Sequence, residues 1–190
     1  MRLSKSSTLV FAAAFLAAIG MGCSDSKPST PKASVEAQVG PGTEEGVNDS
    51  AKCQLKSEPW AIIGDPASGT ISDGDPVDGA TLIVRCTVRP DGDGFRVEAN
   101  AEIQNKQGFS VTGHFTPTGA QANVIGSWND INTGTFRQED CTADYSSNSI
   151  MSVAAGRVWA NITCPHATIS GTDRTCLATA QFRFENCSQE

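Results

Sequence analysis

The stretch ATLIVRCTVRPDGDGFRVEANAEIQNKQGFSVTGHFT, residues 80–116, carries the strongest structural signal of this chain. Apolar and polar residues alternate through most of three successive segments: 80–89, 95–104 and 108–116. In the first segment the apolar face carries Leu82, Val84, Cys86 and Val88. Alternation with a period of two residues is typical of half-buried antiparallel strands. Short, turn-rich connections at PDGDG and NKQG separate the segments, so we predict a three-stranded meander.

Weaker alternating segments flank the meander. We predict further strands at 60–63, 120–127, 135–143, 150–164 and 176–186. No stretch shows a sustained apolar period of 3.6 residues, which an amphipathic helix would require. The sequence therefore predicts an all-β protein, an antiparallel β-sandwich or partly closed barrel of about eight strands.

Residues 1–23 read MRLSKSSTLVFAAAFLAAIGMGC, with a basic start, a short apolar run and small residues before Cys23. These are the parts of a secretory signal. The small residues that end at Cys23 resemble the lipobox of bacterial lipoproteins. The resemblance implies removal of residues 1–22 and acyl chains on Cys23 that anchor the protein to a membrane. Gly20 stands where an aliphatic residue is usual, so ordinary cleavage that leaves Cys23 as a free thiol is the alternative.

The chain has seven cysteines, and removing Cys23 leaves an even number. The remaining six are Cys53, Cys86, Cys141, Cys164, Cys176 and Cys187. An even set in an exported chain predicts three disulfides, whereas the long spacings and the lack of a C-x-x-C pair disfavour a metal site. Sequence alone does not choose the pairing. We expect Cys164–Cys176 across a hairpin, with Cys86–Cys187 and Cys53–Cys141 as the remaining pairs.

Composition divides the rest of the chain. Residues 24–52 are rich in Ser, Pro, Gly, Lys and Glu and have no aromatic residue. We predict that residues 23–52 are a lipidated cysteine and a disordered tether, and that 53–190 is one β domain. The formal net charge of the whole chain is −7. That sign opposes binding to nucleic acid, which requires a basic surface.

The acidic stretch DGDPVDG holds Asp73, Asp75 and Asp78. Carboxylates at alternate positions could converge on a calcium ion. The EF-hand pattern fails, however, because Val77 and Val84 occupy two of its ligand positions. We therefore favour a turn built from Asp and Gly, and keep calcium as the weaker interpretation.

The chain has two histidines, His114 and His166. A catalytic zinc needs about three protein ligands, and no G-x-S-x-G or H-E-x-x-H sequence occurs. We expect no cofactor and no enzymatic activity. The alternative, an envelope hydrolase, requires one of these histidines beside a nucleophile and a carboxylate.

Trp159 is the most informative aromatic residue. Its neighbours Val158 and Ala160 define the inward parity of their strand, so Trp159 should point outward with Arg157 and Asn161. An exposed aromatic beside polar groups could stack on a sugar ring or anchor a protein partner. The more common arrangement is a loop or second layer that covers such a residue, and we favour it.

These observations predict a membrane-anchored lipoprotein that displays a non-catalytic binding or structural module in the cell envelope. Ser24 after the cysteine favours the outer membrane or the cell surface over the inner membrane. The expected partners are the membrane, through the lipid, and an envelope protein or glycan. A carrier of small apolar ligands is the alternative, and it predicts an enclosed apolar cavity.

Overall fold

The computed structural model of the 190-residue chain describes residues 29–42, 52–55, 58–146, 150–169 and 171–190. The predicted signal and Cys23 lie outside these residues, so lipidation of Cys23 stays a prediction. In the described residues no helix is long and apolar enough to cross a membrane.

The described residues form twelve strands and no helix, which confirms the all-β prediction. The strands are β1 (Lys32–Gly40), β2 (Glu58–Ile63), β3 (Ile71–Ser72), β4 (Pro76–Val77), β5 (Ala80–Asp91), β6 (Gly94–Ile103), β7 (Gln107–Phe115), β8 (Gln121–Asp130), β9 (Gly134–Asp144), β10 (Ser152–Ala154), β11 (Arg157–Ile169) and β12 (Thr175–Glu185).

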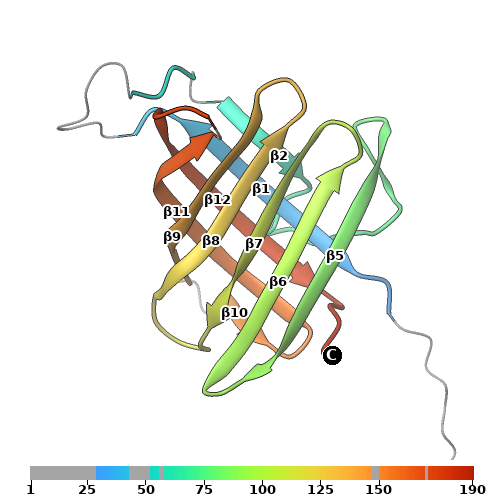
Figure 1. The fold of residues 1–190 in the computed structure, drawn as a ribbon. Coiled ribbons are helices and arrows are strands. Elements are labelled where there is room, and N and C mark those ends of the chain that lie inside the picture. The colour runs from blue at the N-terminus through green and yellow to red at the C-terminus, as the bar shows by residue number, and fades with distance from the viewer. Residues whose placement is uncertain (1–28, 43–51, 56–57, 147–149, 170) are drawn as a thin grey trace, which may run out of the picture.

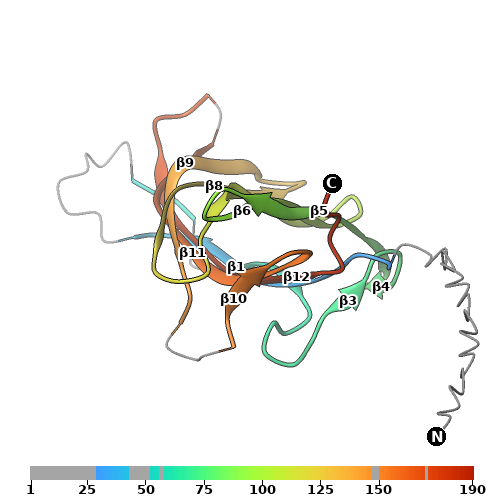
Figure 2. The same ribbon diagram turned by 90° about the horizontal axis from the view of Figure 1, so that it is seen from below.

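All twelve strands belong to one antiparallel sheet with the order β2-β1-β12-β11-β9-β8-β7-β6-β5-β4, while β10 pairs with β11 and β3 with β1. The sheet folds over on itself into two layers (Figures 1 and 2). Strands β5 to β9 form one layer, and β11, β12, β1 and β2 form the other, with strands of the two layers crossing steeply (Figure 1). The result is a barrel that is nearly closed.

The predicted meander is confirmed. Strands β5 and β6 pair from Leu82 opposite Ile103 to Asp91 opposite Gly94, and β6 pairs with β7 in the same antiparallel way. Gly92 has a φ of 60° in the turn between β5 and β6, and Asn105 has a φ of 56° in the next turn. Residues that tolerate positive φ are what such tight turns require.

Aromatic side chains fill the space between the two layers. The largest of them are less than 2% exposed: Trp128, Phe109, Phe115, Phe182 and Phe184. The ring centroid of Phe109 lies 5.4 Å from those of both Trp128 and Phe182. Burying one such side chain contributes about 1.5–3 kcal/mol. The interior is therefore a packed core, and the indole N–H of Trp128 donates to the Thr179 carbonyl oxygen at 3.1 Å.

The predicted tether is wrong for residues 32–40. They form β1, and all nine residues pair with β12. The inward residues Ala33, Val35, Ala37 and Val39 are 0–1% exposed. Composition hid this strand, because its apolar residues are small and lie between Ser-rich and Gly-rich neighbours. The β domain therefore begins before β1 rather than at residue 53.

One predicted strand is divided. The range 150–164 contains β10 and the first part of β11, which pair as a hairpin. The turn between them contains Gly156, whose φ is 75°. A residue with positive φ reverses the chain there, so the alternation on either side belongs to two neighbouring strands.

Three disulfides form, as predicted, and they are typical of proteins in an oxidising compartment. The pairs are Cys53–Cys176, Cys86–Cys187 and Cys141–Cys164. Cys86–Cys187 is the pair expected from the sequence, whereas the expected Cys164–Cys176 and Cys53–Cys141 are wrong.

The register of β11 explains the wrong pairs. This strand continues past Cys164 to Ile169, so the residues between Cys164 and Cys176 are not only a loop. Thr163 lies opposite Thr142 of β9, which places Cys164 next to Cys141 across the two strands. On its other side Cys164 lies opposite Ala178 of β12, and after a bulge it is Ala167 that lies opposite Cys176, so Cys164 and Cys176 are not neighbours.

Candidate functional site

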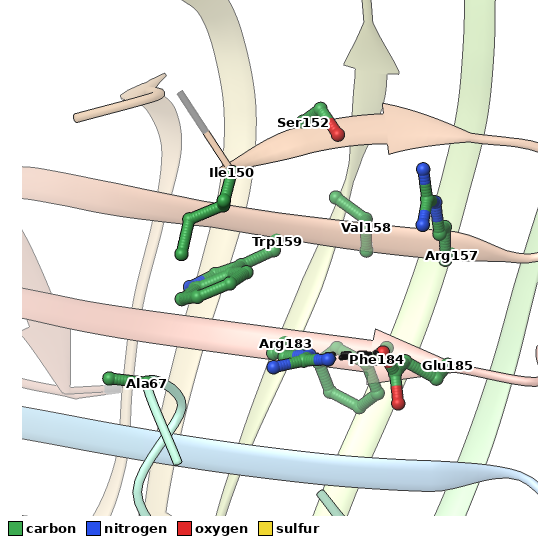
Figure 3. Close-up of a pocket in the computed structure, with 9 residues that line it drawn as sticks. All are labelled: Ala67, Ile150, Ser152, Arg157, Val158, Trp159, Arg183, Phe184 and Glu185. Carbon is green, nitrogen blue, oxygen red and sulfur yellow. Dashed lines mark hydrogen bonds and ion pairs between the residues drawn. The ribbon is translucent and has the colours of Figure 1, made fainter. Parts of the chain in front are cut away.

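A groove lies on the outer face of the layer that contains β11 and β12 (Figure 3). Side chains of paired strands point to the same face when they stand directly opposite each other. Trp159 of β11 stands opposite Ser152 of β10 on one side and Arg183 of β12 on the other. The inward neighbours Val158 and Phe184 are 0–1% exposed, so Trp159 and Arg183 face outward.

The groove is open to solvent and has a volume of about 490 Å³. Its polar and aromatic lining comes from Ser152, Arg157, Trp159, Arg183 and Glu185, with Ile150 and Ala67 at its sides. Figure 3 shows Arg183 alongside the indole of Trp159, with Arg157 and Glu185 at the other end of the groove. This is a polar hollow with one aromatic wall, rather than an apolar pocket.

Arg183 and Glu185 form an ion pair in the groove. Arg183 donates to Glu185 Oε1 through Nε at 3.0 Å and through Nη2 at 2.6 Å. Thr70 Oγ1 donates to the other carboxylate oxygen at 2.8 Å. Each oxygen of Glu185 therefore accepts at least one hydrogen bond from the protein itself.

Opposing effects act on the pKa of Glu185. Partial burial of its side chain acts to raise the pKa, because it removes water from the charged carboxylate. The hydrogen bonds from Arg183 and Thr70, together with nearby positive charge that includes Lys32, act to lower it. The net effect places the pKa below its ordinary value, so Glu185 is ionised at neutral pH.

Trp159 contacts a cation. Arg183 Cζ lies 4.8 Å from the indole ring centroid, within the range of a cation–π contact. The indole Nε1 is shielded from solvent and has no hydrogen-bond acceptor among the described residues. Buried donors are normally paired, so an unpaired one at a groove calls for a functional explanation.

A short loop, residues 64–70, forms one side of the groove. Asp65 organises it by accepting hydrogen bonds from the backbone N–H of Ala67 at 2.8 Å and from the Ser68 hydroxyl. The Ser68 hydrogen bond is the main reason why the pKa of Asp65 lies below its ordinary value. Arg183 Nη1 donates to the Pro66 carbonyl oxygen at 3.4 Å, which connects this loop to β12.

The structure brings together two of the three residues considered for ligand binding. Trp159 and Arg157 both line the groove. Asn161 lies one step further along β11, where its side-chain amide donates to Asp144 Oδ1 at 3.2 Å, and it is not a lining residue. The expected cover over Trp159 is partial, because its side chain is neither buried nor fully exposed.

Sequence reasoning missed Arg183 and Glu185. A signal for both exists, because Phe182 and Phe184 define the inward parity of β12 and so assign Arg183 and Glu185 to its outer face. That parity does not reveal that β12 pairs with β11. Only the pairing places Arg183 against Trp159.

The three aspartates considered for calcium serve local turns. Asp73 Oδ1 accepts from the Val84 backbone N–H at 2.7 Å, and Asp75 Oδ2 accepts from the Ser72 backbone N–H at 3.3 Å. Asp78 has a φ of 50°, and its carbonyl oxygen accepts from Lys106 Nζ. Within the described ranges, no group of three or more His, Cys, Asp or Glu side chains is placed to hold a metal ion.

The two histidines lie on different strands, β7 and β11. His114 Nε2 lies 2.9 Å from the Asp91 carbonyl oxygen and 3.4 Å from Asp93 Oδ1. His166 is exposed, and its backbone N–H donates to Gln138 Oε1 at 2.7 Å. In the described part of the chain, neither ring has a hydroxyl or thiol within hydrogen-bonding distance, so the arrangement needed for hydrolysis is not assembled there.

No protein-family model, no curated protein and no solved structure matches this chain.

Proposed function

We propose that this protein is an exported, lipid-anchored module that binds a component of the cell envelope without catalysis. The groove beside Trp159 is its binding surface. The lipobox-like residues before Cys23 support the anchor, and the three disulfides support export to an oxidising compartment. The observation that carries the proposal is the open groove with an aromatic wall on a disulfide-linked barrel.

A rigid support favours a binding role. The groove is built mainly from paired strands rather than from long loops, so the backbone that carries most of its side chains is held in place by the sheet. Preorganised side chains reduce the entropy that binding must offset. A catalytic role has less support, because in the described residues neither histidine lies beside a nucleophile.

The carrier alternative has less support. It requires an enclosed apolar volume between the layers. That space is filled by Phe109, Phe115, Trp128 and Phe182, each less than 2% exposed.

Two experiments test the proposal. Mass spectrometry of the mature protein should find acyl chains on Cys23. A soluble chain of residues 24–190 should sediment with envelopes of the bacterium that encodes it. Replacing the indole in Trp159→Ala removes the aromatic wall, so we expect envelope binding to weaken at least tenfold.

Arg137→Gln is the matched control, because Arg137 is exposed on β9 away from the groove. It should bind envelopes as the unaltered chain does, and thermal unfolding should show that both variants are folded. A chain that does not bind envelopes, or that cleaves envelope material, would contradict the proposal.

A further inference from the structure

We propose that the groove binds an acidic saccharide, with Trp159 as the ring platform and Arg157 as the group that recognises the anionic substituent. This inference rests on the proposed function and names its ligand class. It follows from the charges, the hydrogen-bonding groups and the shape of the groove.

The charge balance of the groove favours an anion. Glu185 is already paired with Arg183, whereas Arg157 is exposed and forms no ion pair with any described acidic residue. Lys32 adds positive charge near Glu185. The groove lining carries two guanidinium groups, Arg157 and Arg183, against one carboxylate, Glu185, on a chain whose formal net charge is −7. Such a local reversal of sign recruits an anionic group specifically.

The hydrogen-bonding groups lead to the same conclusion. The carboxylate of Glu185 accepts from Arg183 and Thr70, so its two oxygens are already engaged. Arg157 and Ser152 provide side-chain donors that the described residues leave unpaired. A groove that is rich in donors and poor in acceptors complements a ligand rich in acceptor oxygens. A guanidinium can hold a carboxylate through two parallel hydrogen bonds.

Trp159 adds a surface for a ring. Arg183 covers part of the indole, and the side chain remains partly exposed on the groove. The flat C–H face of a pyranose packs on such a surface, while its hydroxyl groups point to the rim. Ile150, which is 63% exposed, lies near the indole in Figure 3.

The shape distinguishes a saccharide from an acidic peptide. Tight protein partners bury anchor side chains in deep, dry pockets. This groove is open and mostly polar, with a volume of about 490 Å³, within the range of small-ligand sites. A uronic acid unit combines a flat apolar face, which would pack on Trp159, with a carboxylate, which would bind Arg157.

The test follows the indole N–H resonances of the soluble chain by ¹⁵N NMR. The chain has three tryptophans, and Trp159→Phe identifies the resonance of Trp159. Trp128 is an internal control, because its N–H is bonded to Thr179 within the core. The probes are tetrasaccharides of galacturonate and of glucuronate, each beside its methyl ester, and tetraglutamate. We expect an acidic tetrasaccharide to shift the Trp159 resonance and to bind at least tenfold more tightly than its ester.

Variants test whether Arg157 recognises the anionic group of the ligand. Arg157→Gln should reduce the affinity for the acidic tetrasaccharide at least tenfold and remove the preference for acid over ester. Arg137→Gln, which removes a cation from β9 away from the groove, should change neither.

Equal binding of acid and ester would overturn the inference, and so would a stronger response to tetraglutamate. The absence of any Trp159 shift with all these probes would overturn it as well. Envelope sedimentation is measured separately. If the chain still sediments with envelopes after any of these outcomes, only the ligand class is wrong. If sedimentation is lost as well, the proposed function fails too.

Discussion

At the scale of single residues, Tyr145 offers a direct measurement of the packing around β9. It is the one tyrosine of the chain. Its hydroxyl donates to the Thr116 carbonyl oxygen at 2.8 Å, and burial raises its pKa from 10.0 to about 12. Burial raises the pKa because the charged phenolate loses solvation when water is removed.

We expect the tyrosine absorbance change to occur near pH 12 in the folded protein and near pH 10 in denaturant. The raised pKa means that the folded state holds the proton more tightly than the unfolded state. This contribution to stability is full below pH 10 and is lost as the pH rises towards 12. Ultraviolet titration measures both values.

Tyr145→Phe is the control for this titration. It should abolish the absorbance change and lower the free energy of unfolding by about 1 kcal/mol, the usual contribution of one hydrogen bond. A folded-state transition near pH 10 would contradict the burial of Tyr145.

Local alternation in the sequence reveals only part of the groove. Alternation around Val158 and Ala160 was enough to place Trp159 on the outer face. The cation beside it comes from β12, and the loop that contains Pro66 comes from more than 100 residues earlier in the chain. Contacts of this kind depend on strand pairing, which a local pattern does not encode.

At the scale of elements, β1 is the clearest difference between prediction and structure. It lies between β12 and β2, so both of its edges are paired. We expect Ala37→Asp to lower the free energy of unfolding by more than about 3 kcal/mol, because the new carboxylate would lie in the core. Ala37 is 0% exposed. Urea unfolding at neutral pH measures the effect.

Gln38→Asp is the matched control, since Gln38 is the exposed neighbour of Ala37 on the same strand. It should change the free energy of unfolding by no more than about 0.5 kcal/mol. Equal and small effects of both substitutions would show that residues 32–40 are not part of the sheet.

The elements that sequence predicts well are those with local signals. The meander of β5, β6 and β7 has long alternating segments and short turns, so each pairing is fixed by its nearest neighbour in the chain. The pairing of β1 with β12 joins residues about 150 positions apart, so no short turn in the sequence indicates that these strands are neighbours. The bulge at Pro165 and His166 has no local sequence signal either. In the structure, the Gln138 side chain accepts a hydrogen bond from the His166 backbone N–H at this bulge.

Across the molecule, the C-terminal tail joins strand β5 to the turn between β10 and β11. Ser188 donates to the Cys86 carbonyl oxygen at 2.9 Å and accepts from the Val88 amide at 2.8 Å. The Gly156 amide donates to the Val88 carbonyl oxygen at 2.9 Å. The disulfide Cys86–Cys187 covalently joins the tail to β5. One network thus connects β5 with the turn that precedes Arg157 in the groove.

We therefore expect removal of this disulfide to affect both stability and the groove. Replacing Cys86 and Cys187 with alanine opens a loop with a sequence separation of 101 residues. The chain-entropy model gives a loss of about 4.7 kcal/mol for a loop of this size. Hydrogen exchange of the Val88 and Gly156 amides should accelerate more than that of the core strands, and saccharide affinity should fall because Arg157 follows the freed turn.

Alanine at Cys141 and Cys164 is the informative comparison. That disulfide joins β9 and β11, which remain paired by their backbone hydrogen bonds, and its sequence separation is only 23 residues. The same entropy model then gives a smaller loss, about 3.4 kcal/mol, and exchange at Gly156 should stay slow. If both double variants released Gly156 equally, the tail would not be what holds the groove in place. If neither did, hydrogen bonding alone would close the barrel, and the disulfide would act mainly on the unfolded chain.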